Sequence, residues 1–182
     1  MVTYVAFLRA INVGGQKLIK MQGLVRMLSD AGFRNVRTYI QSGNVIFDSS
    51  SANSVSVKRK LERAIAHSLG YEVTIVLKRL DDLERLIRNA PFNKIRSDAK
   101  VMFFVVLLAD DPQVKPKLPF VFEKERVTLI ELKDGLAFVV ARQKPNGWFG
   151  FPNAFVEKKL GVAATTRNWN TLNKIIEAAE KK

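Results

Sequence analysis

The fold is decided by the stretch VRTYIQSGNVIF, residues 36–47. Two short runs, residues 36–41 and 44–47, are rich in β-branched and aromatic side chains and surround the pair Ser42-Gly43. This composition favours two antiparallel strands joined by a tight turn. The stretch therefore predicts a β-hairpin and, with it, an antiparallel sheet.

Residues before the hairpin predict one strand and one helix. Residues 3–9 are mainly β-branched and aromatic and run into a glycine turn at 12–15, as expected of a strand that ends there. From Lys20 the apolar side chains recur at the spacing of one helical face, and Gly32 is placed to end the helix. The apolar positions of this helix are Met21, Leu24, Val25, Leu28 and Ala31.

Residues after the hairpin repeat the same pair of elements. Asn53 or Ser54 can cap a helix that Gly70 ends, and residues 72–77 then alternate as a strand. The predicted order over residues 1–78 is thus β-α-β-β-α-β, which is the order of a ferredoxin-like α+β subdomain.

Residues 79–182 predict a second α+β subdomain, packed with the first as one compact protein. Asp81 can cap a helix, residues 101–108 form an apolar strand, and residues 127–132 and 136–141 form a hairpin around Asp134-Gly135. A short helix at 154–160 and a final helix that begins near Trp169 follow. The order of elements resembles that of the first part without any sequence repeat, so a second ferredoxin-like unit is one architecture to test.

The composition is strongly basic and lacks cysteine. The 182 residues include 30 Lys and Arg against 17 Asp and Glu, a formal charge of +13 that attracts polyanions or simply keeps the protein soluble. Disulfides, thiolate catalysis and cysteine-rich zinc sites are excluded. The longest apolar run, residues 101–109, is too short for a membrane span, and the first residues lack the pattern of a signal peptide. We therefore expect a cytoplasmic protein without a membrane partner.

Few residues suit catalysis. His67 is the only histidine and falls on the predicted second helix, where an exposed position is expected. The pair Asp81-Asp82 is explained by a helix start, and Asp110-Asp111 by a turn before Pro112, although these acids could also serve as a base or bind magnesium. The sequence assigns no catalytic residue, no metal site and no cofactor.

One glycine turn suggests anion binding. In the segment RAINVGGQK, residues 9–17, Gly14 and Gly15 can expose backbone N–H groups, and Arg9 and Lys17 flank them with Asn12 nearby. The spacing matches neither of the common glycine-rich phosphate-binding motifs. A flexible turn that needs positive φ is the alternative interpretation.

Three segments together carry a family resemblance: FLRAINVGG at 7–15, TYIQSGNV at 38–45 and TTRNWNT at 165–171. The chain resembles the bacterial domain-of-unknown-function family numbered sixteen-ninety-seven. The resemblance implies an α+β fold of ferredoxin-like character and a small cytosolic bacterial protein, and it implies no activity, cofactor or catalytic residue. The stretch WFGFP at 148–152 departs from the family pattern, and we expect its aromatics to pack against the core or a partner subunit.

The three segments are rich in side chains that form hydrogen bonds but rarely react, which favours recognition over catalysis. Arg167 precedes the last helix, so its guanidinium and the helix N-terminus could hold a phosphate or carboxylate; alternatively Asn168 caps the helix and Arg167 forms an internal ion pair. The predicted ligand-binding residues are Arg9, Asn12, Gly14, Gly15, Lys17, Gln41, Ser42, Asn44, Arg167 and Asn168.

Three functions follow as hypotheses. The first is a binding module for a phosphate-bearing small molecule or a polyanion such as nucleic acid. The second is an enzyme acting on a nucleotide-like or phosphorylated small molecule. The third is a non-catalytic interaction or structural protein, whose polar segments brace its own fold. The sequence predicts no oligomeric state.

Overall fold

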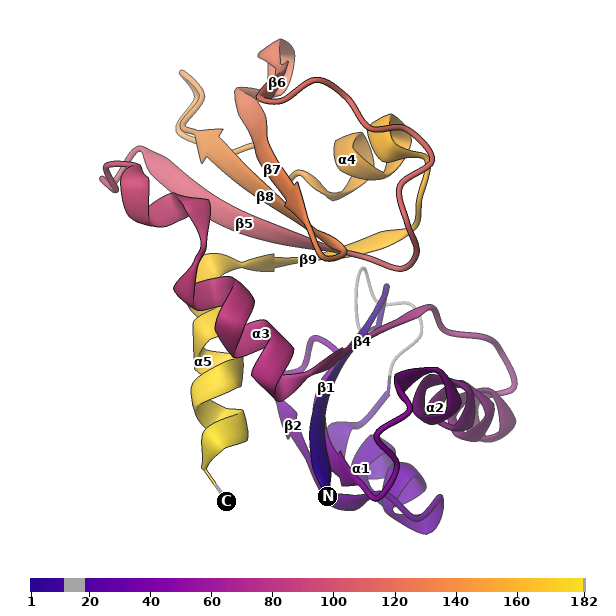
Figure 1. Ribbon diagram of the computed structural model, residues 1–182. Coiled ribbons are helices and arrows are strands. Elements are labelled where there is room, and N and C mark those ends of the chain that lie inside the picture. Colours follow the sequence, from indigo (N-terminus) through magenta and orange to yellow (C-terminus); the bar gives the residue numbers. More distant parts are fainter. Residues whose placement is uncertain (12–18, 182) are drawn as a thin grey trace. The chain divides into compact units, whose positions relative to one another are not determined.

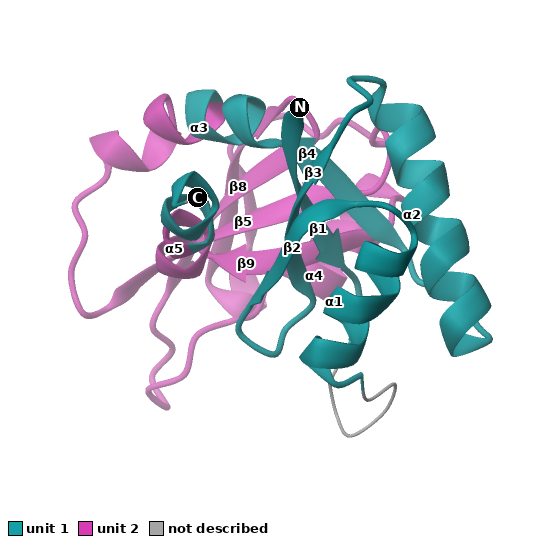
Figure 2. Ribbon diagram, turned by 90° about the horizontal axis from the view of Figure 1, so that it is seen from below, with its two compact units in different colours: residues 1–85, 175–182 teal, residues 86–174 magenta. Residues whose placement is uncertain are grey.

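The computed structural model describes residues 1–11 and 19–181 and contains two antiparallel sheets with helices, so the predicted α+β class is confirmed (Figure 1). Two compact units are distinguished, residues 1–85 with 175–182 and residues 86–174 (Figure 2). The elements of the described residues are β1 (Val2–Leu8), α1 (Met21–Asp30), β2 (Arg34–Tyr39), β3 (Asn44–Ser49), α2 (Ser54–Leu69), β4 (Ile75–Arg79), α3 (Leu80–Arg88), the 3-10 turn η1 (Pro91–Lys94), β5 (Val101–Leu108), β6 (Phe120–Phe122), the 3-10 turn η2 (Glu123–Glu125), β7 (Val127–Lys133), β8 (Leu136–Arg142), α4 (Asn153–Leu160), β9 (Ala164–Asn168) and α5 (Trp169–Glu180).

The first unit contains the strands in the order β2-β3-β1-β4, and every neighbouring pair is antiparallel. The β2–β3 hairpin is observed as predicted, but it closes at the pair Tyr39 and Asn44, so the turn comprises residues 40–43 and includes Ile40 and Gln41, which the sequence prediction places in the first strand. The elements follow one another as β-α-β-β-α-β. The name ferredoxin-like for this unit stays a prediction.

Helices α1 and α2 supply the core of the first unit. Leu24 and Leu28 of α1 and Leu61 and Ile65 of α2 are fully buried in one cluster with alternate residues of β1 and β3. The side chain of Asn53 accepts a hydrogen bond from the N–H of Ser56 at 3.1 Å, and Gly70 ends α2 in the left-handed conformation. Both ends of α2 therefore use the capping residues that the sequence predicts.

The end of α5 belongs to the first unit, which explains why this unit takes residues from both ends of the chain. The guanidinium of Arg37 on β2 donates to the carbonyl oxygens of Ala178 and Ala179 at 3.2 and 2.8 Å. These bonds satisfy carbonyls of the last helical turn, which have no partners within the helix. The predicted division at residues 78 and 79 stays a prediction, whereas the compact units change at residues 85–86 and 174–175.

The second unit contains the strands in the order β6-β7-β8-β5-β9, again with antiparallel neighbours. Helix α4 packs Val156 and Leu160 into a cluster with β5, β7 and β8. Apart from the short strand β6, the order β7-β8-β5-β9 repeats that of the first unit, with each strand counted within its own unit. In place of a helix after its first strand, residues 109–119 form an irregular segment, as their prolines predict.

Strands β6 and β9 are absent from the sequence prediction. Strand β9 is polar, yet its residues Thr165, Thr166 and Arg167 are all buried, so it lacks the apolar pattern by which a buried strand is recognised. Its residues looked instead like the approach to α5. The described residues contain no helix that is long and apolar enough to cross a membrane.

Candidate functional site

The first two polar segments meet in the first unit. The N–H of Leu8 at the end of β1 donates to the carbonyl of Gly43 in the hairpin turn at 2.8 Å. Gly43 has φ +70, and a Cβ there would lie 3.0 Å from the Cβ of Leu8 and 3.4 Å from that of Ile11. Glycine is thus required both by its backbone conformation and by the close approach of the two segments.

The side chain of Asn44 forms hydrogen bonds within the hairpin turn. Asn44 is fully buried, and its amide nitrogen donates to the carbonyl of Tyr39 at 3.0 Å and to the hydroxyl of Ser42 at 2.8 Å. Gln41 is exposed and Ser42 half-buried. The amide of Asn44 therefore braces the turn, which is the internal role that the third hypothesis assigns to these segments.

The glycine turn is described only in part. Arg9 is half-buried directly after β1, and its N–H donates to the carbonyl of Thr74 at 2.9 Å. The predicted ligand-binding residues Asn12, Gly14, Gly15 and Lys17 lie outside the described residues. The anion site proposed for this segment stays a prediction.

Arg167 lies in the second unit, on β9 opposite Val105 of β5. Its guanidinium donates from Nη1 to the hydroxyl of Thr165 at 2.8 Å and to the carbonyl of Thr166 at 2.9 Å. Burial lowers its pKa from its ordinary value to about 10, because desolvation penalises the charged form. Arg167 therefore braces its own strand from a buried position.

Asn168 shapes the start of α5. It is half-buried, and its side-chain oxygen accepts a hydrogen bond from the N–H of Asn170 at 2.9 Å. This bond satisfies one of the free N–H groups of the first helical turn, as the capping alternative expects.

The residues considered for catalysis do not form one cluster. His67, Asp110 and Asp111 are all exposed, and Asp81 and Asp82 lie in the first turn of α3. Within residues 1–11 and 19–181, no group of three or more His, Asp and Glu side chains could hold a metal ion.

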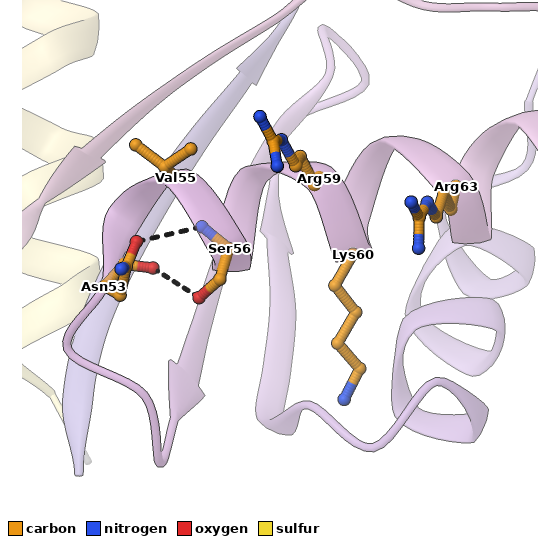
Figure 3. A pocket seen from close by; sticks show the side chains of 6 residues that line it. All are labelled: Asn53, Val55, Ser56, Arg59, Lys60 and Arg63. Atoms are coloured by element: carbon orange, nitrogen blue, oxygen red, sulfur yellow. Dashed lines mark hydrogen bonds between the residues drawn. The ribbon is translucent and has the colours of Figure 1, made fainter.

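A cation-rich hollow of about 630 Å³ lies along the outer side of α2 (Figure 3). Arg59, Lys60 and Arg63 contribute the charges, beside the capping pair Asn53 and Ser56. The charged groups diverge, because Lys60 points away from Arg59 and its ammonium lies 5.0 Å from the centre of the Phe33 ring (Figure 3). A ligand here would not meet several cations at once, which a selective pocket requires.

A second hollow, of about 470 Å³, lies in the second unit where three strand ends meet. Lys100 precedes β5, Arg126 precedes β7, and Arg142 is the last residue of β8. Because β8 lies between β7 and β5, these three cations are neighbours at one end of the sheet. We call this hollow the strand-end pocket; it is lined by Asp98, Lys100, Val101, Arg126, Arg142, Gln143, Lys144 and Pro145.

Backbone hydrogen bonds fix the strand ends that carry these cations. The N–H of Arg142 donates to the carbonyl of Arg126 at 2.8 Å, and the N–H of Gln143 donates to that of Lys100 at 2.9 Å. Arg126 has φ +52, a left-handed conformation that is uncommon for any residue other than glycine. Arg126 takes this conformation as the residue that ends the 3-10 turn η2.

Two carboxylates at the strand-end pocket, Asp98 and Glu125, offset half of its four positive charges. Glu125 forms an ion pair with Lys144, and Asp98 accepts a hydrogen bond from the N–H of Lys100 at 2.7 Å. Among the described residues, no carboxylate lies within 4.0 Å of a side-chain nitrogen of Lys100, Arg126 or Arg142. The pocket can therefore offer at least three cations to an anionic ligand.

Sequence reasoning missed this pocket although part of the signal is visible. The Asp134-Gly135 turn closes the β7–β8 hairpin at the pair Lys133 and Leu136. If the two strands paired without interruption from this turn, residue 126 would lie opposite residue 143. The extra residue Ile130 shifts the register by one, so that Val127 faces Ala141. Arg126 and Arg142 thereby become neighbours, which the turn alone does not predict.

Comparison with known proteins identifies the family. The family described as "Protein of unknown function (DUF1697)" matches residues 1–131, which include the first two polar segments and the hairpin stretch. The chain belongs to this family. The resemblance drawn from the three segments is thus confirmed. No curated protein matches this DUF1697 member at a significant level.

A solved structure supports the fold of this DUF1697 protein. The conserved bacterial protein SP0830 from Streptococcus pneumoniae is 24% identical, with a TM-score of 0.69 and alignment over 100% of this chain and 99% of that one. At this identity the likeness establishes the shared α+β fold alone.

Proposed function

We propose that this protein binds a phosphate-bearing ligand in the strand-end pocket. The observation that carries the proposal is the meeting of Lys100, Arg126 and Arg142 at three adjacent strand ends, without a described carboxylate paired to any of the three. Charge-assisted hydrogen bonds from arginine to phosphate are short, directional and about twice as strong as neutral ones. Phosphate chemistry suits such a pocket because its several oxygens can bind several cations together.

Two features support a selective pocket over a diffuse basic surface. The cations sit on strand ends joined by backbone hydrogen bonds, so the backbone that carries them is already ordered before a ligand binds. Arg126 is fixed at the rim because it ends η2 in the left-handed conformation, with its N–H bonded to the carbonyl of Glu123 at 3.1 Å. The hollow along α2 lacks such convergence and is the natural comparison.

The proposed ligand class is that of the first hypothesis, but the binding site is the strand-end pocket and not the three polar segments. Arg167 and Asn44 engage internal partners, so binding is assigned to residues that sequence reasoning did not name. We retain a cytoplasmic location as part of the proposal, on the lack of cysteine.

The test measures binding of inorganic tripolyphosphate by titration calorimetry to two double variants of equal charge. Arg126→Gln with Arg142→Gln removes two pocket cations, whereas Arg59→Gln with Arg63→Gln removes two from α2. We expect the pocket variant to bind about 100-fold more weakly, since a hydrogen bond to a charged group contributes about 1.5–3 kcal/mol, and the α2 variant to change less than about threefold. Equal weakening by both variants, or no binding by the wild type at low salt, would overturn the proposal.

A further inference from the structure

Trp148 is an exposed tryptophan of the second unit. Its side chain is 75% exposed, whereas Phe149 packs against the core of the second unit and Phe151 stacks edge-on against Phe104. Phe149 and Phe151 contact the second unit, in line with the expectation that these aromatics pack against the core or a partner subunit, whereas for Trp148 that expectation stays a prediction. A large, flat apolar surface is left in water close to the strand-end pocket.

The turn that carries Trp148 is built from the pocket lining. Gln143 and Lys144 line the pocket, and the N–H of Lys144 donates to the carbonyl of Trp148 at 2.8 Å. The side-chain amide of Gln143 donates to the carbonyl of Gly147 at 2.9 Å, and Asn146 accepts from the N–H of Trp148 at 3.1 Å. Trp148 is therefore presented by a turn held together by its own hydrogen bonds.

One end of this turn is bonded to a residue that lines the pocket, and the other end packs against the two neighbours of Arg126. At its start, the N–H of Gln143 donates to the carbonyl of Lys100. At its end, a Cβ on Gly150 would lie 2.7 Å from the carbonyl oxygen of Glu125 and 2.8 Å from Val127, so the chain passes directly beside the segment that holds Arg126. Along the chain, Trp148 therefore lies between Gln143, which is bonded to Lys100, and Gly150, which packs beside the segment that holds Arg126.

Cations beside an exposed aromatic ring are the two parts of a site for unpaired nucleotides. Phosphates bind the basic residues, and a base stacks on the aromatic face, whichever base it is. A duplex offers phosphates as well, but its bases are stacked on one another and cannot cover a tryptophan ring. Resting on the proposed function, we propose that the ligand of the strand-end pocket is single-stranded nucleic acid, with one base stacked on Trp148.

Tryptophan fluorescence supplies a direct readout of stacking. The chain has two tryptophans, and Trp169 is packed against Phe92 at 5.0 Å between ring centres. In the variant Trp169→Phe, the fluorescence reports on Trp148 alone. We expect an oligothymidylate of about 12 nucleotides to quench it, and tripolyphosphate, which has no bases, to bind without quenching.

Affinity variants separate the two proposals. We expect Trp148→Ala to weaken oligothymidylate binding about tenfold or more and to leave tripolyphosphate binding unchanged. Trp148→Phe should keep most of the affinity for oligothymidylate, because phenylalanine also offers an aromatic face. Val114→Ala, at a half-exposed position of the same unit, is the control for loss of an exposed apolar side chain.

The outcomes distinguish failure of the inference from failure of the proposed function. Suppose that tripolyphosphate binding depends on Arg126 and Arg142, but that Trp148→Ala leaves the affinity for oligothymidylate unchanged. The stacking inference is then wrong and the phosphate site stands. A duplex that binds as tightly as the single strand, or a mononucleotide that binds as tightly as the oligomer, also overturns it. If neither probe binds, both proposals fall.

Discussion

Single residues show how polar segments can serve the fold itself. Arg167 is 8% exposed, and its hydrogen bonds to Thr165 and Thr166 lie within its own strand. Because burial lowers its pKa to about 10, the unfolded chain holds this proton more strongly than the folded one once the pH rises above about 10. The burial of the charge therefore opposes folding in full at every pH below about 10, and this cost falls as the pH rises above that value.

Two replacements of Arg167 should separate what its volume and its charge contribute to the free energy of unfolding. Arg167→Ala leaves a cavity and removes the hydrogen bonds to Thr165 and Thr166, so we expect the free energy of unfolding to fall by about 2 kcal/mol or more. Arg167→Met fills most of the volume and removes the buried charge, so its loss should be smaller. Urea denaturation at pH 7.5 measures both, with Asn170→Ala at an exposed position as the control, expected within about 0.5 kcal/mol. A larger loss with methionine than with alanine would contradict this account.

Residue types also limited what could be predicted about the candidate site. The sequence predicts Asn44 as a ligand-binding residue, because asparagine forms hydrogen bonds but rarely reacts. The same signal, however, is produced by an amide that binds a ligand and by one that braces the turn. Only its full burial and its two partners distinguish these roles.

At the scale of elements, close backbone approach makes one glycine a sensitive test of the strand-end pocket. A Cβ on Gly150 would press on the carbonyl of Glu125 and on Val127, neither of which can yield without moving the start of β7. We expect Gly150→Ala to lower the free energy of unfolding by about 1–3 kcal/mol. Because Arg126 would move too, tripolyphosphate binding should weaken as well, which calorimetry on the folded variant measures.

Gly23→Ala is the matched control for Gly150→Ala. Gly23 lies exposed within α1, and a Cβ there would meet nothing within 4 Å. Alanine should therefore stabilise the helix by about 0.5–1 kcal/mol without touching the pocket. If the two alanine variants changed stability in the same direction, the close approach at Gly150 would not be a constraint.

Elements with clear periodicity and caps were predictable, whereas those set by tertiary pairing were not. Helix α2 has an apolar face with Asn53 and Gly70 at its ends, and both caps are observed. Strand β9 instead gains its place by pairing with β5, and its buried polar side chains hide it from a hydrophobic pattern. The bulge at Ile130 is similarly invisible in the sequence, yet it decides which cations meet at the strand-end pocket.

For the whole molecule, the charge of +13 and the pocket should act on different steps of binding. Charges spread over the surface steer an anion during its approach, so they affect mainly the rate of association, and salt screens them. Cations that touch the bound ligand affect mainly the rate of dissociation. The two effects can be separated because α2 carries cations that do not line the strand-end pocket.

Stopped-flow measurement of oligothymidylate binding tests this separation with the two double variants. At about 10 mM salt, where the Debye length is about 30 Å, Arg59→Gln with Arg63→Gln should slow association about threefold and leave dissociation unchanged. At about 150 mM salt that difference should nearly vanish. Arg126→Gln with Arg142→Gln should accelerate dissociation at both salt concentrations, because direct contacts are lost. If the pocket variant altered only association, and only at low salt, Arg126 and Arg142 would be part of the diffuse field and not of a binding site.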